Sequence, residues 1–180
     1  RAGRPEALDR GAFADGELFV ADVVVDPLNP DRLFVAALGH PYGPNAERGV
    51  YRSVDGGRSF EWVLYRDEYT SANDLVLDPS DPNTIYATLW PQQQSFREGL
   101  AFGGAGMGIF KSTDGGGTWT QLANTNNSDF HYVNKIVASP NSASVVYAAT
   151  GTGVWKTTNS GTDWTKVLAA DGSGGTAGST

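Results

Sequence analysis

Apolar residues in this chain occur in short runs that alternate with turn-forming polar residues. A run such as Leu33–Leu38 is rich in β-forming residues, and such runs end near Pro, Gly, Asn or Asp, which are typical of turns. No stretch keeps apolar residues at positions i, i+3, i+4 and i+7 over three helical turns. The pattern therefore predicts an all-β protein with short strands and almost no helix.

A longer pattern repeats three times along the chain. The first half of each unit is an apolar run, a proline-containing turn and a second run of alternating β-formers. These segments span 23–38, 75–90 and 136–151, with the turns at Pro27, Pro79 and Pro140. Proline with nearby Asn, Asp or Ser does not suit a strand interior, so each segment predicts two antiparallel strands joined by a turn.

The second half of each unit contains a nine-residue box, RSVDGGRSF at 52–60, KSTDGGGTW at 111–119 and KTTNSGTDW at 156–164. A side chain that accepts backbone N–H groups and a glycine that permits positive φ together describe a tight turn. We expect the box residues to be structural, because the amide of Asn159 can accept the same bonds without a charge. The aligned positions are Ser53, Asp55, Gly57 and Phe60; Ser112, Asp114, Gly116 and Trp119; and Thr157, Asn159, Gly161 and Trp164.

Each box is expected to join a third strand to a fourth. Four short antiparallel strands per repeated unit are typical of a β-propeller blade. We expect an N-terminal extension at 1–20, a first blade at 21–65, a second at 66–123 with a long loop at 91–107, a third at 124–170, and a flexible tail or linker at 171–180.

Three units are fewer than the roughly four blades that a closed propeller needs at minimum. The predicted fold class is therefore all-β, with three four-stranded antiparallel blades in an incomplete ring or in a ring closed by oligomerisation. Open end blades expose strand edges and apolar faces. We accordingly expect either self-association or further blades of the same parent chain.

The box pattern Ser-x-Asp-x-Gly-x-x-Trp resembles the Asp-box, or bacterial neuraminidase repeat, of sialidases, sortilin-type domains and family 74 glycoside hydrolases. A photosystem II assembly factor carries related repeats. The stretch 37–60 is most similar to large exported bacterial repeat proteins described as sortilin-like or glycosyl-hydrolase-like. The resemblance covers about residues 21–168. It implies a β-propeller whose boxes lie opposite the ligand-binding face, in an extracellular or periplasmic protein.

Composition excludes several classes of function. The 180 residues are 39% hydrophobic, which is enough for a core, and the net charge of −7 comes without a basic cluster for nucleic acid. The longest apolar run is too short to cross a bilayer. The absence of cysteine excludes thiolate metal sites, and two distant histidines do not make a metal site. We expect no nucleic acid, membrane insertion, metal or cofactor.

Candidate ligand-binding residues lie on the irregular loops. In a propeller the loops between second and third strands share one face with the loops that join blades. Aromatic rings stack on the apolar faces of sugars while polar groups bond the hydroxyls, so this face predicts a glycan or peptide ligand. An alternative of equal weight is that Trp90 and Tyr42 only pack a loop onto its blade. The candidates are His40, Tyr42, Asn45, Arg48, Tyr69, Asp74, Trp90, Gln92, Gln94, Arg97, Glu98, His131 and Asn134.

The leading hypothesis is a non-catalytic segment that binds a ligand or acts as a scaffold in an exported bacterial protein. Glycoside hydrolysis needs two carboxyl groups held close together, one with a raised pKa. No spacing brings any two loop carboxylates together, and the arginine triad of sialidases is not recognisable, so we assign no catalytic residue. The alternatives are part of a xyloglucanase-like glycoside hydrolase propeller and a purely structural, self-assembling module.

Overall fold

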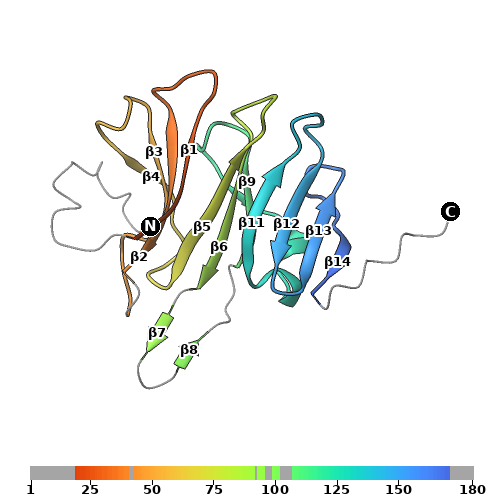
Figure 1. Ribbon diagram of the computed structural model, residues 1–180. Coiled ribbons are helices and arrows are strands. Elements are labelled where there is room, and N and C mark those ends of the chain that lie inside the picture. Colours follow the sequence, from red (N-terminus) through yellow and green to blue (C-terminus); the bar gives the residue numbers. More distant parts are fainter. Residues whose placement is uncertain (1–18, 41–42, 92, 96–98, 102–106, 171–180) are drawn as a thin grey trace.

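The computed structural model describes residues 19–40, 43–91, 93–95, 99–101 and 107–170. The described residues form strands and two short 3-10 helices, and none of them lies in an α-helix. Three four-stranded antiparallel sheets stand next to one another (Figure 1). The predicted all-β class and the three four-stranded units are confirmed.

Each sheet contains its strands in chain order, so neighbouring strands are joined as hairpins. We call the sheets blades 1, 2 and 3. Blade 1 comprises β1 (Phe19–Val25), β2 (Leu33–Gly39), β3 (Gly49–Ser53) and β4 (Glu61–Leu64). Blade 2 comprises β5 (Thr70–Leu77), β6 (Ile85–Pro91), β9 (Gly108–Ser112) and β10 (Thr120–Gln121). Blade 3 comprises β11 (Val133–Ala138), β12 (Val146–Thr150), β13 (Gly153–Thr157) and β14 (Thr165–Ala169).

The second blade differs in two ways from the sequence expectation. Its long loop carries a small hairpin, β7 (Gln93–Ser95) and β8 (Gly99–Ala101), which extends away from the sheet (Figure 1). Its last strand is only two residues long, because the chain turns into the 3-10 helices η2 (Ala123–Thr125) and η3 (Ser128–Phe130). Thr125 supplies a hydrogen bond that a longer last strand would make with β9: its Oγ1 accepts the backbone N–H of Ile109 at 3.0 Å.

β1 begins at Phe19, slightly before the expected first blade. The remainder of the expected extension at 1–20 and the expected tail at 171–180 lie outside the described residues.

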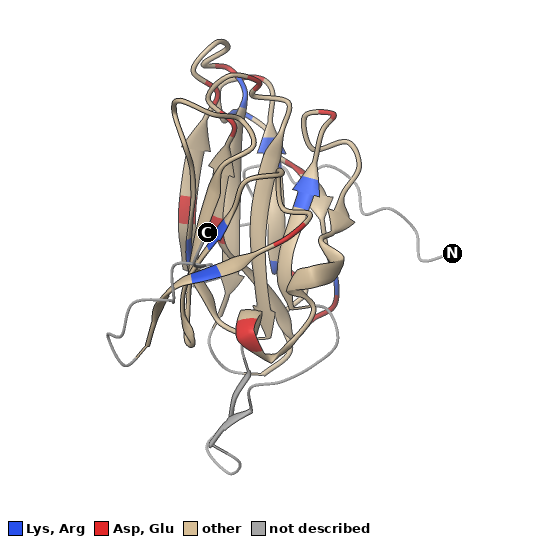
Figure 2. Ribbon diagram, turned by 90° about the vertical axis from the view of Figure 1, so that its right-hand side faces the viewer, with Lys and Arg blue, Asp and Glu red and all other residues tan. Residues whose placement is uncertain are grey.

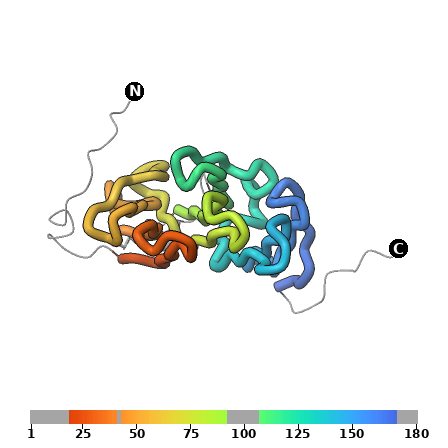
Figure 3. The backbone as a smooth tube through the Cα atoms, turned by 90° about the horizontal axis from the view of Figure 1, so that it is seen from above, coloured from red at the N-terminus to blue at the C-terminus, as the bar shows by residue number. Residues whose placement is uncertain are grey.

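The hydrophobic core lies between blades rather than within them. One cluster joins Phe34 and Val50 of blade 1 to Leu75 of blade 2, and a second joins Tyr86 of blade 2 to Ile136 of blade 3. Seen from above, the three blades follow one another in a row (Figure 3). Burial of apolar surface therefore couples each blade to the next.

The first strand of each blade, which we call the inner strand, is an edge strand of its sheet. Outward N–H groups on such an edge have no partner in their own ladder. A carboxylate of the preceding blade supplies the acceptor: Asp22 Oδ2 accepts the N–H of Leu75 at 3.0 Å, and Asp74 Oδ2 accepts that of Ile136 at 2.6 Å. In all three blades a register shift lies at the same place, between Val20 and Asp22, between Ala72 and Asp74, and between Val133 and Lys135.

Asp74 also forms an ion pair with Lys135, with Nζ and Oδ1 2.6 Å apart. Replacing Asp74 by Ala leaves the buried N–H of Ile136 without its acceptor, whereas Lys135, whose side chain is 57% exposed, can bond water instead. We call such a contact between neighbouring blades a seam. We expect a loss of about 1.5–3 kcal/mol in the free energy of unfolding, the usual range for hydrogen bonds to a charged group. Urea denaturation followed by tryptophan fluorescence measures it.

The matched control is Asp129→Ala, which removes the ion pair with Lys166, 3.4 Å long and about one-third to two-fifths exposed. A surface pair of this kind contributes less than about 1 kcal/mol. Equal losses in the two variants would contradict a stabilising role for the seam at Asp74.

Candidate functional site

The three boxes fold into the same hydrogen-bonded turn. In the first, Ser53 Oγ donates to Asp55 Oδ1 at 2.8 Å and accepts the N–H of Gly57 at 2.9 Å. The same two bonds measure 2.8 and 2.9 Å in the second box, and 2.9 and 3.0 Å in the third. The aligned glycines have φ between 81° and 93°, which explains why glycine stands there.

The box carboxylates are held ionised by the turn. Asp55 accepts the hydroxyl of Ser59 at 2.6 Å, and Asp114 accepts that of Thr118 at 2.7 Å, with the backbone N–H groups of the same residues adding further bonds. These bonds hold the pKa of Asp55 well below its usual range and lower the pKa of Asp114 to about 2. Asn159 occupies the same position and accepts the N–H of Asp163 at 2.9 Å.

Each box lies beside the proline-containing turn of its own blade. The N–H of Gly56 donates to Asp31 O at 2.9 Å, that of Gly115 to Asn83 O at 3.0 Å, and that of Ser160 to Ser144 O at 2.9 Å. The boxes and these turns form one end of the row of blades, at the top of Figure 1. We call it the box face.

The opposite end, which we call the connector face, consists of His40 and residues 43–48, the connectors 65–69 and 123–132, and the end of β6. The backbone N–H of Asn45 donates to Glu68 O at 2.9 Å and ties the loop of blade 1 to the connector that leads to blade 2. The structure thus brings together two of the segments on which candidate ligand residues were expected, 43–48 and 65–69.

Arg48 and Asn45 are interior residues of this face. Arg48 is fully buried and donates to the backbone oxygens of Tyr69 at 3.0 Å, His40 at 2.8 Å and Gly43 at 3.1 Å. Burial lowers the pKa of Arg48, and the charge of Asp67 opposes that shift. Asn45 is buried and its Oδ1 accepts the N–H of Glu47 at 2.9 Å. Both side chains fold the loop and neither reaches the surface where a ligand would bind.

Asp74 likewise belongs to the interior, since only 3% of it is exposed. Burial raises its pKa, and its bonds to Lys135 and Ile136 oppose the shift. Its carboxylate is turned into the seam with blade 3. One signal could have revealed this role: Asp22 and Asp74 each stand one residue before the aligned apolar runs that begin at 23 and 75.

Five candidates remain on the connector face with surface that solvent reaches. Tyr69 is 42% exposed, Asn134 is exposed, and His40, Trp90 and His131 are half-buried. Tyr132, which was not a candidate, packs edge-on against Trp90 with ring centroids 5.8 Å apart. Tyr42, Gln92, Arg97 and Glu98, and the side chain of Gln94, lie outside the described residues.

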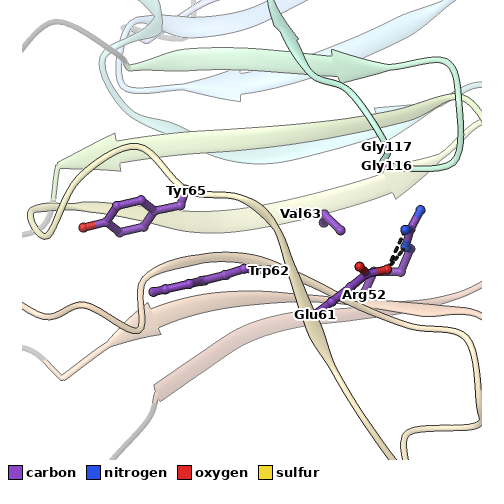
Figure 4. A pocket seen from close by; sticks show the side chains of 7 residues that line it. All are labelled: Arg52, Glu61, Trp62, Val63, Tyr65, Gly116 and Gly117. Atoms are coloured by element: carbon purple, nitrogen blue, oxygen red, sulfur yellow. Dashed lines mark hydrogen bonds and ion pairs between the residues drawn. The ribbon is translucent and has the colours of Figure 1, made fainter. Parts of the chain in front are cut away.

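A separate hollow of about 210 Å³ lies between the outer strand of blade 1 and the box of blade 2. Its two charged groups are already paired, because Arg52 binds Glu61 Oε1 through Nη2 at 2.5 Å and through Nε at 2.9 Å. Figure 4 shows this ion pair toward one end and Trp62 and Tyr65 toward the other. Ligand pockets are usually larger, from about 300 Å³ upward. Sequence reasoning did not find this hollow. Its lining consists of Arg52, Glu61, Trp62, Val63, Tyr65, Gly116 and Gly117.

Basic and acidic residues are interspersed along the described strands and loops (Figure 2). Among the described residues, no three or more His, Cys, Asp or Glu side chains gather where they could hold a metal ion. No helix in the described ranges has the length and apolar character to span a membrane.

Comparison with solved structures shows which known fold the three blades resemble. An ancestral GH74 enzyme superposes on 84% of this chain with a TM-score of 0.64 and 27% identity. The fold is a β-propeller segment. A GH74 xyloglucanase from Xanthomonas campestris matches this propeller segment over 82% of its length, with a TM-score of 0.57 and 19% identity. YCF48 bound to a D1 peptide matches over 92%, with a TM-score of 0.58 and 16% identity.

The propeller segment thus resembles blades of the Asp-box propellers in GH74 enzymes and YCF48 over most of its length. It spans 19% of the ancestral GH74 chain, 23% of the xyloglucanase chain and 43% of the YCF48 chain. No family model matches the sequence, and no curated protein matches it either.

The lowered pKa of Asp114 makes a prediction for acid stability. Because the folded box favours the ionised carboxylate, its stabilising contribution is present above pH 3.8, the ordinary pKa, and is lost as the pH falls toward about 2. In Asp114→Asn the amide accepts bonds as Asn159 does but takes up no proton. We expect a shallower loss of the free energy of unfolding over that pH range, measured by urea denaturation.

Asp129→Asn, which lies outside the boxes, is the control for a general change in charge. An Asp114→Asn variant whose acid profile equals that of the wild type would show that the box does not stabilise the carboxylate.

Proposed function

We propose that this propeller segment binds a glycan on its connector face and does not cleave it. The observation that supports the proposal most strongly is the arrangement of aromatic rings there. Trp90 and Tyr132 pack edge to face, and Tyr69 stands 42% exposed on the neighbouring connector. Rings fixed by packing offer flat apolar surfaces at low cost in side-chain entropy, which suits the apolar faces of sugar rings.

Polar groups of the right kind stand near these rings. Asn134 is exposed on the inner strand of blade 3, and His131 is half-buried on the connector that carries Tyr132. Amide and imidazole groups donate and accept hydrogen bonds and can therefore bond sugar hydroxyls. The box face offers no comparable set, because its carboxylates and hydroxyls are bonded within their turns.

The comparisons favour a glycan ligand. The 27%-identical structure is a GH74 enzyme, a member of a family of glycoside hydrolases. We therefore propose a polysaccharide ligand and take xyloglucan as the probe, because one matched GH74 structure is a xyloglucanase, although at 19% identity that likeness concerns the fold alone. The exported location expected from the sequence would bring the segment to such a polysaccharide. The peptide bound by YCF48 supports a peptide ligand less, because at 16% identity that likeness concerns the fold alone.

Among the described residues, the carboxyl group with a raised pKa is not placed for hydrolysis on the connector face. A glycosidase needs an accessible carboxyl group whose pKa is raised. Asp74 has a raised pKa, but it is buried and bonded in the seam. Asp55 and Asp114 have lowered pKa values and lie on the box face. None of these three can act as the acid for a ligand on the connector face.

Titration calorimetry with xyloglucan oligosaccharides tests the proposal. We expect Tyr69→Ala and Trp90→Ala each to weaken binding about 2- to 10-fold, because one stacked ring contributes about 0.5–1.5 kcal/mol. Val54→Ala, which removes an apolar side chain that is 60% exposed on the box face, should leave the affinity unchanged.

Three results would contradict the proposal. The first is an absence of binding to any β-glucan, and the second is binding that both aromatic variants leave intact. The third is the release of reducing ends from xyloglucan by the segment, which would instead favour the glycoside hydrolase alternative.

A further inference from the structure

The seams inside the structure use the same positions in each blade. Between blades 1 and 2, Arg52 Nη1 donates to Gly115 O at 2.6 Å; between blades 2 and 3, Lys111 Nζ donates to Ser160 O at 3.3 Å. The two acceptors occupy the same position in their boxes. The boxes of blades 2 and 3 therefore each also receive a cation from the preceding blade.

An aromatic ring accompanies each of these cations. Phe34 and Tyr86 occupy aligned positions in the second strands, and both are fully buried against the next blade. The ammonium of Lys111 lies 5.3 Å from the centre of the Tyr86 ring, and the hydroxyl of Tyr86 donates to Ser160 O at 3.4 Å. Ring and cation thus act together on one box carbonyl.

Blade 3 presents the same pair on its far side, which we call the trailing face. Tyr147 aligns with Tyr86, and Lys156 aligns with Lys111; the ammonium of Lys156 lies 5.6 Å from the Tyr147 ring. Tyr147 is 37% exposed, and beside it Val137 is 48% exposed. Among the described residues no box stands in front of this pair.

Blade 1 presents the complementary side, which we call the leading face. Val23 and Val25 are each 51% exposed, whereas the aligned Leu75 and Leu77 of blade 2 are 2% and 8% exposed under blade 1. Gly56, which aligns with the acceptors Gly115 and Ser160, is exposed. The leading face therefore offers an apolar strand and a box in the positions that blades 2 and 3 use.

The two faces also compensate each other at the aspartate position. Lys135 stands in blade 3 where Asp22 and Asp74 stand in blades 1 and 2, so the trailing face offers no carboxylate there. The leading face needs none, because the N–H of Val23 is already accepted by its own Asp22 Oδ1 at 2.9 Å. The trailing face thus lacks the aspartate, and the leading face does not need it. These are the two faces that a further seam would join.

From this complementarity we propose that the trailing face of one copy binds the leading face of a second copy. Tyr147 and Lys156 reach the box carbonyl of Gly56 in the other copy, and Val23 and Val25 are buried beneath them. Two such contacts join two copies into a ring of six blades, within the range of about four to eight for propellers. Each seam joins two different faces, and a twofold axis relates the two seams, so the assembly is closed. This interface is independent of the glycan proposed above.

Sedimentation equilibrium and native mass spectrometry of the 180-residue chain test the proposal. We expect a particle of two 19.1-kDa chains. The double variant Tyr147→Ala/Lys156→Ala on the trailing face, and Val23→Asp on the leading face, should each be monomeric. The dissociation constant should rise at least about tenfold per seam, and therefore about a hundredfold for two seams. Far-UV circular dichroism checks that each variant keeps its strands.

Matched changes away from both faces are the controls. Arg66→Ala removes an exposed cation on a connector, and Leu28→Asp places an acid at a side chain 78% exposed on the box face. Both should leave the two-chain particle intact.

Mixing the two monomeric variants tests the pairing of faces directly. A mixed pair keeps one intact seam, so equal amounts of Val23→Asp and Tyr147→Ala/Lys156→Ala should form a two-chain particle that neither forms alone. A monomeric wild type, an open-ended polymer, or a dimer that survives both sets of substitutions would overturn the proposal. A mixture that stays monomeric would also overturn the proposal. So would a wild-type dimer that only one of the two sets of substitutions breaks, because a contact between identical faces gives that result.

Discussion

The packing of each blade on the preceding one depends on the unpaired edge of its inner strand. β5 and β11 each carry N–H groups that their own sheet cannot bond, and they lie against the preceding blade rather than in water. A buried N–H without an acceptor costs about 1–3 kcal/mol. Asp22 and Asp74 supply the acceptors, one residue after a bulge that recurs in each inner strand. The aspartates therefore fix both the distance and the register between blades.

The boxes serve the same assembly. Their hydroxyl, carboxylate or amide, and glycine close a turn. In blades 2 and 3 a carbonyl of the box then accepts Arg52 or Lys111 of the preceding blade. With these groups bonded, the box face has few polar groups free to contact a ligand. The connector face differs, because Trp90 and Tyr132 pack together there while remaining half-buried, and Tyr69 is 42% exposed. The regular part of the repeat builds the blades, and its irregular loops carry the proposed function.

The sequence predicts the strands and turns well, because alternation, proline and the box spacing are local signals. It predicts the candidate site less well. Spacing places Arg48 and Asp74 near the expected face, but only the packed loop buries Arg48 and only the bulge before Asp74 turns its carboxylate into the seam. The β7–β8 hairpin has no such signal, since Gln93–Ser95 lacks the usual β-forming residues. Strands and turns can be predicted from one sequence because their signals are local, whereas the direction of a side chain depends on how neighbouring loops and blades pack.

Amide hydrogen exchange measured by NMR tests the seam most directly. In the wild type, the N–H groups of Leu75 and Ile136 should be among the slowest to exchange, because each is buried and bonded to a carboxylate of the preceding blade. In Asp22→Ala, Leu75 should exchange at least about tenfold faster while Ile136 stays protected. Exchange at Leu75 that is unchanged in Asp22→Ala would contradict the account, because the blades would then be held together without the aspartate.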